Sequence, residues 1–193
     1  MDGYQLRTEK KKELILKTAF DLLLAFGAHK MSIAEVAKKA NVSPVSIYNY
    51  FGSKDGLVRS ALLHMMEKKI GEYEGILEEP LSFQDKIRKI VFDRGEIANL
   101  LEQDLVRAMM DDAAIKDEIE RFYETRTLPF FGKLVEAGKR EGCIDPQLSP
   151  EAVLFYVHMF KEAMARPGFS AQANPAMLQD LNRLLYYGLV GKA

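Results

Sequence analysis

Apolar residues recur every three or four positions along most of the chain, and this spacing predicts helices. We expect them over residues 10–26, 33–40, 44–51, 53–71, 82–91, 96–110, 114–140, 150–166 and 175–189. Strand patterns are scarce, and Gly and Pro mostly separate the helical runs. The chain is therefore predicted to be all-α with nine helices, the long seventh one kinked at Pro129.

Signals for helix starts and ends are densest in residues 32–59. Ser32 and Glu35 have the spacing of a capping box, and Ser43 followed by Pro44 begins the next helix. Asn41 between them tolerates the left-handed conformation that closes a helix. A further end and start are expected at Gly52 and Ser53. These signals predict a helix-turn-helix followed by a third helix.

The pattern also predicts which faces of these helices are buried. The first helix is expected to bury Leu14, Ala19, Leu22, Leu23 and Phe26. In the helix over 44–51, inward packing is open to Ile47, Tyr48 and Phe51, whereas Val45, Ser46 and Asn49 can point outward. The outward set is the expected reading surface.

Several positions together resemble the DNA-binding domain of the tetracycline-repressor (TetR) family, over roughly residues 10–60. The matching positions are Ile15 to Phe26, Gly27, Ser32, Val36-Ala37, Val42-Ser43, Tyr48-Asn49-Tyr50-Phe51 and Ser53-Lys54. The resemblance implies an N-terminal helix-turn-helix domain over residues 1–52. It also implies an effector-binding and dimerisation domain over residues 53–193.

The resemblance also suggests which side chains contact DNA. Phosphate contacts are expected from Ser32, Tyr48, Tyr50 and Lys54. Contacts to base edges are expected from Val45, Ser46 and Asn49, since Asn can bond adenine and Val can meet a thymine methyl. The alternatives are that Ser32 only caps a helix, that Tyr48 and Tyr50 pack, and that Lys54 is solvated. Val45 departs from the family pattern, which usually has a smaller residue there.

Charge is distributed unevenly along the chain. Residues 1–60 hold ten Lys or Arg and six Asp or Glu, a net +4, whereas residues 61–193 hold 17 and 22, a net −5. A basic N-terminal part fits a localised DNA footprint, although chance variation between two solvated surfaces would also explain it. Lys10, Lys11 and Lys12 could reach a phosphate or the minor groove, or form a solvated tail.

Other classes of function find little support. Cys143 is the single cysteine, and neither a metal-ligand cluster, a phosphate-binding loop nor a nucleophile elbow appears. No secretory signal or long apolar run appears, so we expect a cytoplasmic protein that is not an enzyme and uses no metal or cofactor.

The C-terminal part is expected to hold a small-molecule effector, as the resemblance implies. The candidate ligand-binding residues are Arg107, Met110, Phe122, Arg126, Phe130, His158 and Lys161. Cations in apolar helices need partners, so an anionic ligand is one explanation. The alternative is plain core packing, with Arg107 and Arg126 paired to Glu102, Glu120 or Glu124.

The last two helices, about 150–166 and 175–189, carry too many apolar residues for one inward stripe each. Two such helices from each subunit could form a four-helix bundle, so we expect a homodimer. The resemblance then implies a transcriptional repressor that leaves a palindromic operator when a ligand binds. A DNA-binding dimer controlled by a protein partner, without a small-molecule effector, is the alternative.

Overall fold

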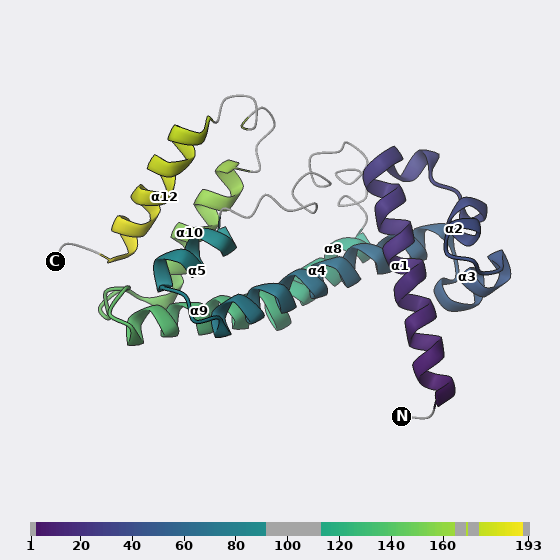
Figure 1. Cartoon of the computed structure of the whole chain (residues 1–193), viewed down its shortest axis with the longest axis horizontal. Coiled ribbons are helices and arrows are strands. Elements are labelled where there is room, and N and C mark those ends of the chain that lie inside the picture. The colour runs from purple at the N-terminus through teal and green to yellow at the C-terminus, as the bar shows by residue number, and fades with distance from the viewer. Residues whose placement is uncertain (1–2, 92–112, 165–168, 170–173, 191–193) are drawn as a thin grey trace. The chain divides into compact units, whose positions relative to one another are not determined.

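The computed structural model describes residues 3–91, 113–164, 169 and 174–190, and the regular elements in these ranges are helices (Figure 1). In chain order they are α1 (Gly3–Lys30), α2 (Ile33–Lys39), α3 (Pro44–Phe51), α4 (Lys54–Glu78), α5 (Phe83–Val91), α8 (Ala113–Phe122), the π-helical η1 (Tyr123–Thr127), α9 (Leu128–Arg140), α10 (Pro150–Met164) and α12 (Pro175–Val190). The all-α prediction is confirmed. Eight of the nine expected helices are found when α8, η1 and α9 are taken as one run, and the expected helix over 96–110 lies outside the described residues.

The chain forms two compact units. The described residues of the first are 3–69 and 113–119, and those of the second are 70–91, 120–164, 169 and 174–190. Helices α4 and α8 each begin in the first unit and end in the second. The expected division into residues 1–52 and 53–193 concerns roles in binding, and it stays a prediction.

The first unit is built on the C-terminal half of α1. Ala19, Leu22 and Leu23 are buried there as expected, but Leu14 and Phe26 are about half exposed, so that part of the prediction is wrong. The helix also begins at Gly3 rather than Lys10. Its expected end at Phe26 agrees with a break at Gly27, whose φ of 74° only glycine adopts readily.

The core of the second unit brings together side chains from five helices and from the turn that follows α9. It consists of Ile70, Tyr73, Phe83, Ile87, Ile90, Phe130, Phe131, Leu134, Val135, Ile144, Val153, Val157 and Leu185. Lys86 is also buried, and its Nζ donates to the Leu77 carbonyl over 2.8 Å near the C-terminal end of α4. The ammonium group thereby satisfies a carbonyl at a helix end, which normally lacks a partner.

The long helical run of the second unit contains a widened turn. The N–H of Leu128 bonds to the carbonyl of Tyr123, five residues earlier, which is the spacing of a π-helix. Pro129 follows directly and has no N–H to continue a regular ladder. A kink was expected at this proline, and the structure has a π turn directly before it.

Two glycines of α9 allow a test of this packing. A Cβ at Gly138 would lie 2.5 Å from Phe83 Cζ and 2.6 Å from Ile144 Cδ1, whereas one at Gly132 would have no atom within 4 Å. We expect Gly138→Ala to lower the free energy of unfolding by about 1–3 kcal/mol through overpacking. Gly132→Ala, the matched control, should leave it unchanged or raise it by about 0.5–1 kcal/mol. Equal urea midpoints for the two variants would contradict this account.

Candidate nucleic-acid interface

Helices α2 and α3 are defined by hydrogen bonds from their own sequence. The Ser32 Oγ accepts from the Glu35 N–H over 3.2 Å, and the Ser43 Oγ accepts from the Ser46 N–H over 3.1 Å. Asn41 between the helices has a φ of 53°, the left-handed conformation predicted for it. Both helix caps and the turn are therefore confirmed, and they fix where α2 and α3 begin.

Helix α3 ends as abruptly as it begins. Gly52 has a φ of 74°, and its N–H bonds to the Tyr48 carbonyl. Ser53 then caps α4 by accepting from the Gly56 N–H over 2.9 Å. A Cβ at Gly56 would collide with the backbone carbonyl oxygen of Phe51, so this close connection requires glycine. The end of α3 and the start of α4 are consequently held together.

One face of α3 is open to solvent. Val45 is 65% exposed, Tyr48 is 51% exposed, and Asn49 is also exposed. These positions are three and four residues apart, so they share one helix face. The inward packing considered for Tyr48 is wrong, and its ring lies on the same face as the two candidate base contacts. Such a face can enter a major groove.

Ser46, the third candidate base contact, is less available. Its side chain is half-buried, and its Oγ lies 2.9 Å from the Ser43 Oγ. Its hydroxyl therefore belongs to the capping arrangement. A contact to DNA would have to share or replace that hydrogen bond, whereas Val45 and Asn49 need no such change.

The remaining phosphate candidates lie at helix ends. Tyr50 is half-buried, and its ring packs edge-on against Phe51 with centroids 6.1 Å apart. Lys12 Nζ of α1 lies 5.7 Å from the centroid of the Tyr50 ring. Lys54 is the first residue of α4 and is half-buried. The exposed Ser32 accepts a bond at its oxygen, which leaves its hydroxyl hydrogen for a phosphate.

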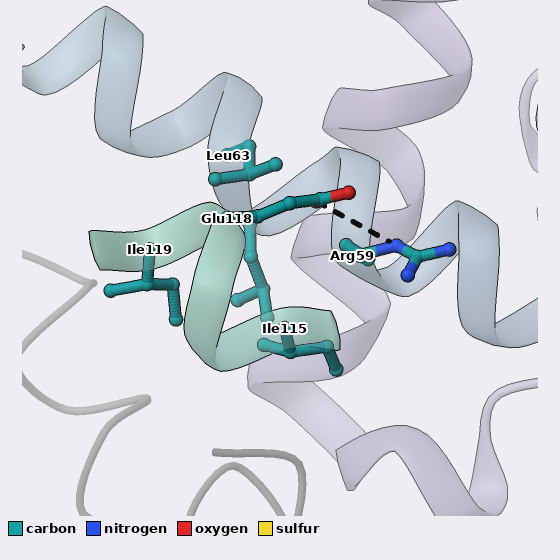
Figure 2. A pocket seen from close by; sticks show the side chains of 6 residues that line it. Arg59, Leu63, Ile115, Glu118 and Ile119 are labelled. Carbon is teal, nitrogen blue, oxygen red and sulfur yellow. Dashed lines mark ion pairs between the residues drawn. The ribbon is translucent and has the colours of Figure 1, made fainter. Parts of the chain in front are cut away.

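The first unit also holds a shallow pocket between α4 and α8 (Figure 2). It is lined by Arg59, Leu62, Leu63, Ile115, Glu118 and Ile119. Arg59 Nε lies 3.7 Å from Glu118 Oε2 at its rim. Its accessible space is about 10 Å³, which is room for roughly one water molecule. The pocket is too small for an effector, but it marks where α8 lies against α4, the helix that follows α3.

The effector candidates of the second unit fall into different environments. Phe130 is buried in the core, with its ring 5.8 Å from Tyr73 and 5.2 Å from Phe131. Phe122 is half-buried against that core. Arg107 and Met110 lie outside the described residues, and the side chain of Lys161 does too. The structure therefore leaves the proposed ligand role of these residues a prediction.

His158 lies among aromatic rings of the second unit. Its ring is 5.5 Å from Phe131 in an edge-on arrangement, and its Nδ1 is 3.3 Å from the Tyr123 hydroxyl. Tyr123 opens the π turn, and π turns are frequent at functional sites. The sequence pattern did not single out Tyr123, because a π turn has no reliable local signature.

Arg126 has a charged partner on another helix. Its guanidinium lies 3.4 Å from Glu74 of α4. Glu102, one of the anticipated partners, lies outside the described residues, so the alternative of pairing with Glu102, Glu120 or Glu124 stays a prediction. Lys133 also contacts this carboxylate over 3.2 Å. The hydrogen bond from Lys133 is the largest influence that lowers the pKa of Glu74, with Arg126 adding to it. The carboxylate stays ionised at neutral pH and offsets much of the charge that an anionic ligand would need.

In the part of the chain that the structure describes, no group of three or more His, Cys, Asp or Glu side chains is placed to hold a metal ion. No described helix has the length and apolar character needed to cross a membrane.

Comparison with known proteins bears on the same region of the chain. The family model of bacterial regulatory proteins of the tetR family matches residues 15–61, which include α2, α3 and the start of α4. The chain is 25% identical over 128 residues to the HTH-type transcriptional regulator YvdT of Bacillus subtilis, covering 66% of this chain and 65% of YvdT. It is 28% identical over 153 residues to YhgD of the same organism, covering 75% and 77%. The match thus spans slightly less than two thirds of the first relative.

Solved structures share the fold over almost the whole chain. The fatty acid degradation regulator FadR from Bacillus halodurans superposes with a TM-score of 0.68 at 19% identity, over 92% of this chain and 98% of that one. FadR from Bacillus subtilis in complex with stearoyl-CoA gives 0.64 at 19% identity, over 92% and 98%. A regulator from Saccharomonospora viridis in complex with choline gives 0.69 at 17% identity, over 95% and 100%. At these identities the likeness concerns the fold alone.

The geometry of α3 generates a test of the assigned contacts. We expect Lys54→Ala or Tyr50→Ala to weaken binding to all duplexes about equally, because phosphate contacts carry no sequence information. Asn49→Ala should instead lose about 1–3 kcal/mol of discrimination at one base position. Fluorescence anisotropy with an operator and with single-base variants of it distinguishes the two effects. Unchanged affinity in all three variants would refute the contact assignment.

Proposed function

The chain belongs to the tetR family of bacterial regulatory proteins and is a transcriptional regulator. We propose that it is a cytoplasmic repressor without enzymatic activity. A homodimer binds a palindromic operator, and a small molecule bound in the second unit releases it. The observation that carries the proposal is the exposed row of Val45, Tyr48 and Asn49 on a short, doubly capped helix.

Support for the dimer comes from apolar side chains left open on α10 and α12. Phe155 and Met159 lie four residues apart on α10 and are 68% and 46% exposed. Leu184 and Tyr187 lie three apart on α12 and are 62% and 61% exposed. Such pairs each share a helix face, and exposed apolar faces mark interaction sites. A second copy of the same helices would cover them, and the resulting two-fold symmetry would match a palindromic operator.

A hydrogen bond links the two helices. The Tyr156 hydroxyl of α10 donates to the Leu184 carbonyl of α12 over 3.2 Å. A Cβ at Gly188 would collide with that hydroxyl, so a larger residue there would force the Tyr156 side chain to shift. Burial raises the pKa of Tyr156, which keeps the phenol neutral and able to donate. The two helices of the proposed interface are therefore already in contact within one subunit.

A route for release follows from chain continuity. Helices α4 and α8 each run from one unit into the other, and within the first unit they meet at Arg59 and Glu118. An effector that favours one arrangement of the second unit would move α4, and with it the turn that fixes α3. To release the operator, the effector must bind one arrangement of the second unit more tightly than the other. Each factor of ten between its two affinities corresponds to roughly 1.4 kcal/mol.

The effector is proposed to bind near Phe122, Tyr123 and His158, beside the π turn. Relatives of the same fold are solved with stearoyl-CoA and with choline, so both chemical classes belong in a first screen. The test selects bound fragments from genomic DNA and then measures operator affinity against acyl-CoA thioesters, fatty acids and quaternary ammonium compounds. We expect one class to weaken operator binding at least tenfold. An enriched palindrome that no compound affects would favour control by a protein partner.

The dimer proposal has its own test. Phe155→Asp combined with Leu184→Asp would bury two carboxylates, which we expect to weaken association by at least about 3 kcal/mol, on the order of 100-fold. Light scattering after size exclusion should then report one chain's mass instead of two. Phe26→Asp is the control, since Phe26 is also half-exposed but lies on α1. A double variant that remains dimeric would place the interface elsewhere.

A further inference from the structure

The first three turns of α1 form a helix with little to pack against. We call residues 3–14 the N-terminal arm. Every described side chain in it is exposed or half-exposed, including Leu6 and Leu14, and continuous burial begins only at Ile15. A helix of this length is marginal in water by itself, because most helical stability in proteins comes from a buried face. The arm therefore lacks the usual reason to remain helical.

The positive charges of the arm further destabilise its helix. Arg7, Lys10 and Lys11 are three and four residues apart, so they lie on one helix face within an arc of about 100°. Like charges at these spacings destabilise a helix. Glu9 and Glu13 lie on another face, where Glu9 pairs with Lys12 over 2.9 Å. Among the described residues, no carboxylate pairs with any of the three cations, and Arg7 bonds only to the Gly3 carbonyl.

The arm lies beside the candidate reading helix. Lys12 Nζ is 5.7 Å from the ring centroid of Tyr50, near the C-terminal end of α3. From there α1 continues past α2 and α3, as the dark purple helix leading to the N-terminus shows (Figure 1). Its 12 residues span about 18 Å, a length over which one DNA strand carries roughly five phosphates. A duplex that receives α3 would have its flank within reach of the arm.

We propose that the N-terminal arm is a second DNA-binding element, in which Arg7, Lys10 and Lys11 contact the phosphate backbone flanking the site of α3. The proposal rests on the proposed function, since it requires α3 to bind DNA. Phosphates would offset the repulsion among the three cations and supply the stabilisation that the arm does not obtain from a core. Such contacts add affinity without base preference.

The test is the salt dependence of DNA binding by the full chain. The variant Arg7→Gln, Lys10→Gln, Lys11→Gln removes three charges from the arm, and Arg88→Gln, Arg121→Gln, Arg140→Gln removes three exposed charges from the second unit. For three lost phosphate contacts the slope of log K against log salt should become less negative by about 2.7. The ratio of the DNA affinity of the unaltered chain to that of the arm variant should then fall roughly 40-fold when the salt concentration is raised from 50 to 200 mM. The control should keep the original slope.

A second measurement locates the contacts. Trimming the flanking base pairs from the duplex should weaken binding by the unaltered chain, but should have little effect on the arm variant. An unaltered chain that binds operator with a slope shared by the arm variant would overturn the arm's role and leave the proposed function standing. If the unaltered chain binds no duplex selectively, both fall. Arm-dependent binding to phosphatidylglycerol vesicles with no change in the DNA slope would assign the arm to a membrane surface instead.

Discussion

The position of α3 depends on the burial of Ile47, the single fully buried side chain of that eight-residue helix. Burying an isoleucine contributes roughly 1.5–3 kcal/mol, which is little for a helix that could not form alone. The rest comes from its ends, where Ser43 supplies the first cap and Gly52 and Ser53 close the other side. Because only Ile47 of α3 is fully buried, the face with Val45, Tyr48 and Asn49 remains exposed and can contact a ligand as large as a DNA duplex.

The same division between buried and open faces recurs elsewhere in the molecule. In the second unit, Val153, Val157 and Leu185 hold α10 and α12 to the core while Phe155 and Leu184 face outward. In the arm of α1 the buried face is missing altogether. The three surfaces differ in chemistry: mixed polar and aromatic on α3, apolar on α10 and α12, and basic on the arm. Each suits a different partner, namely base edges, a second copy of the chain, and phosphate.

Local signals in the sequence predicted local structure well. The caps at Ser32, Ser43 and Ser53 and the left-handed Asn41 depend on atoms within about four residues, so the sequence contains the whole interaction. Predictions that depended on distant residues fared worse. Leu14 and Phe26 match the apolar period of α1, but they are about half exposed among the described residues. Arg126 bonds to Glu74, 52 residues away, a partner that the helical spacing did not indicate.

By itself, the sequence determined the helical class, the order of the described helices, the starts of α2 and α3, and the residues that form the turn into α3. Those features arise from backbone hydrogen bonds and side-chain caps that close within a few positions. Only the tertiary structure decided which apolar and charged residues are left without cover. That choice depends on where other helices lie, and it separates Tyr48 on the open face of α3 from Ile47 in the core. The apolar residues proposed to meet a second subunit, Phe155, Met159, Leu184 and Tyr187, are distinguished in this second way.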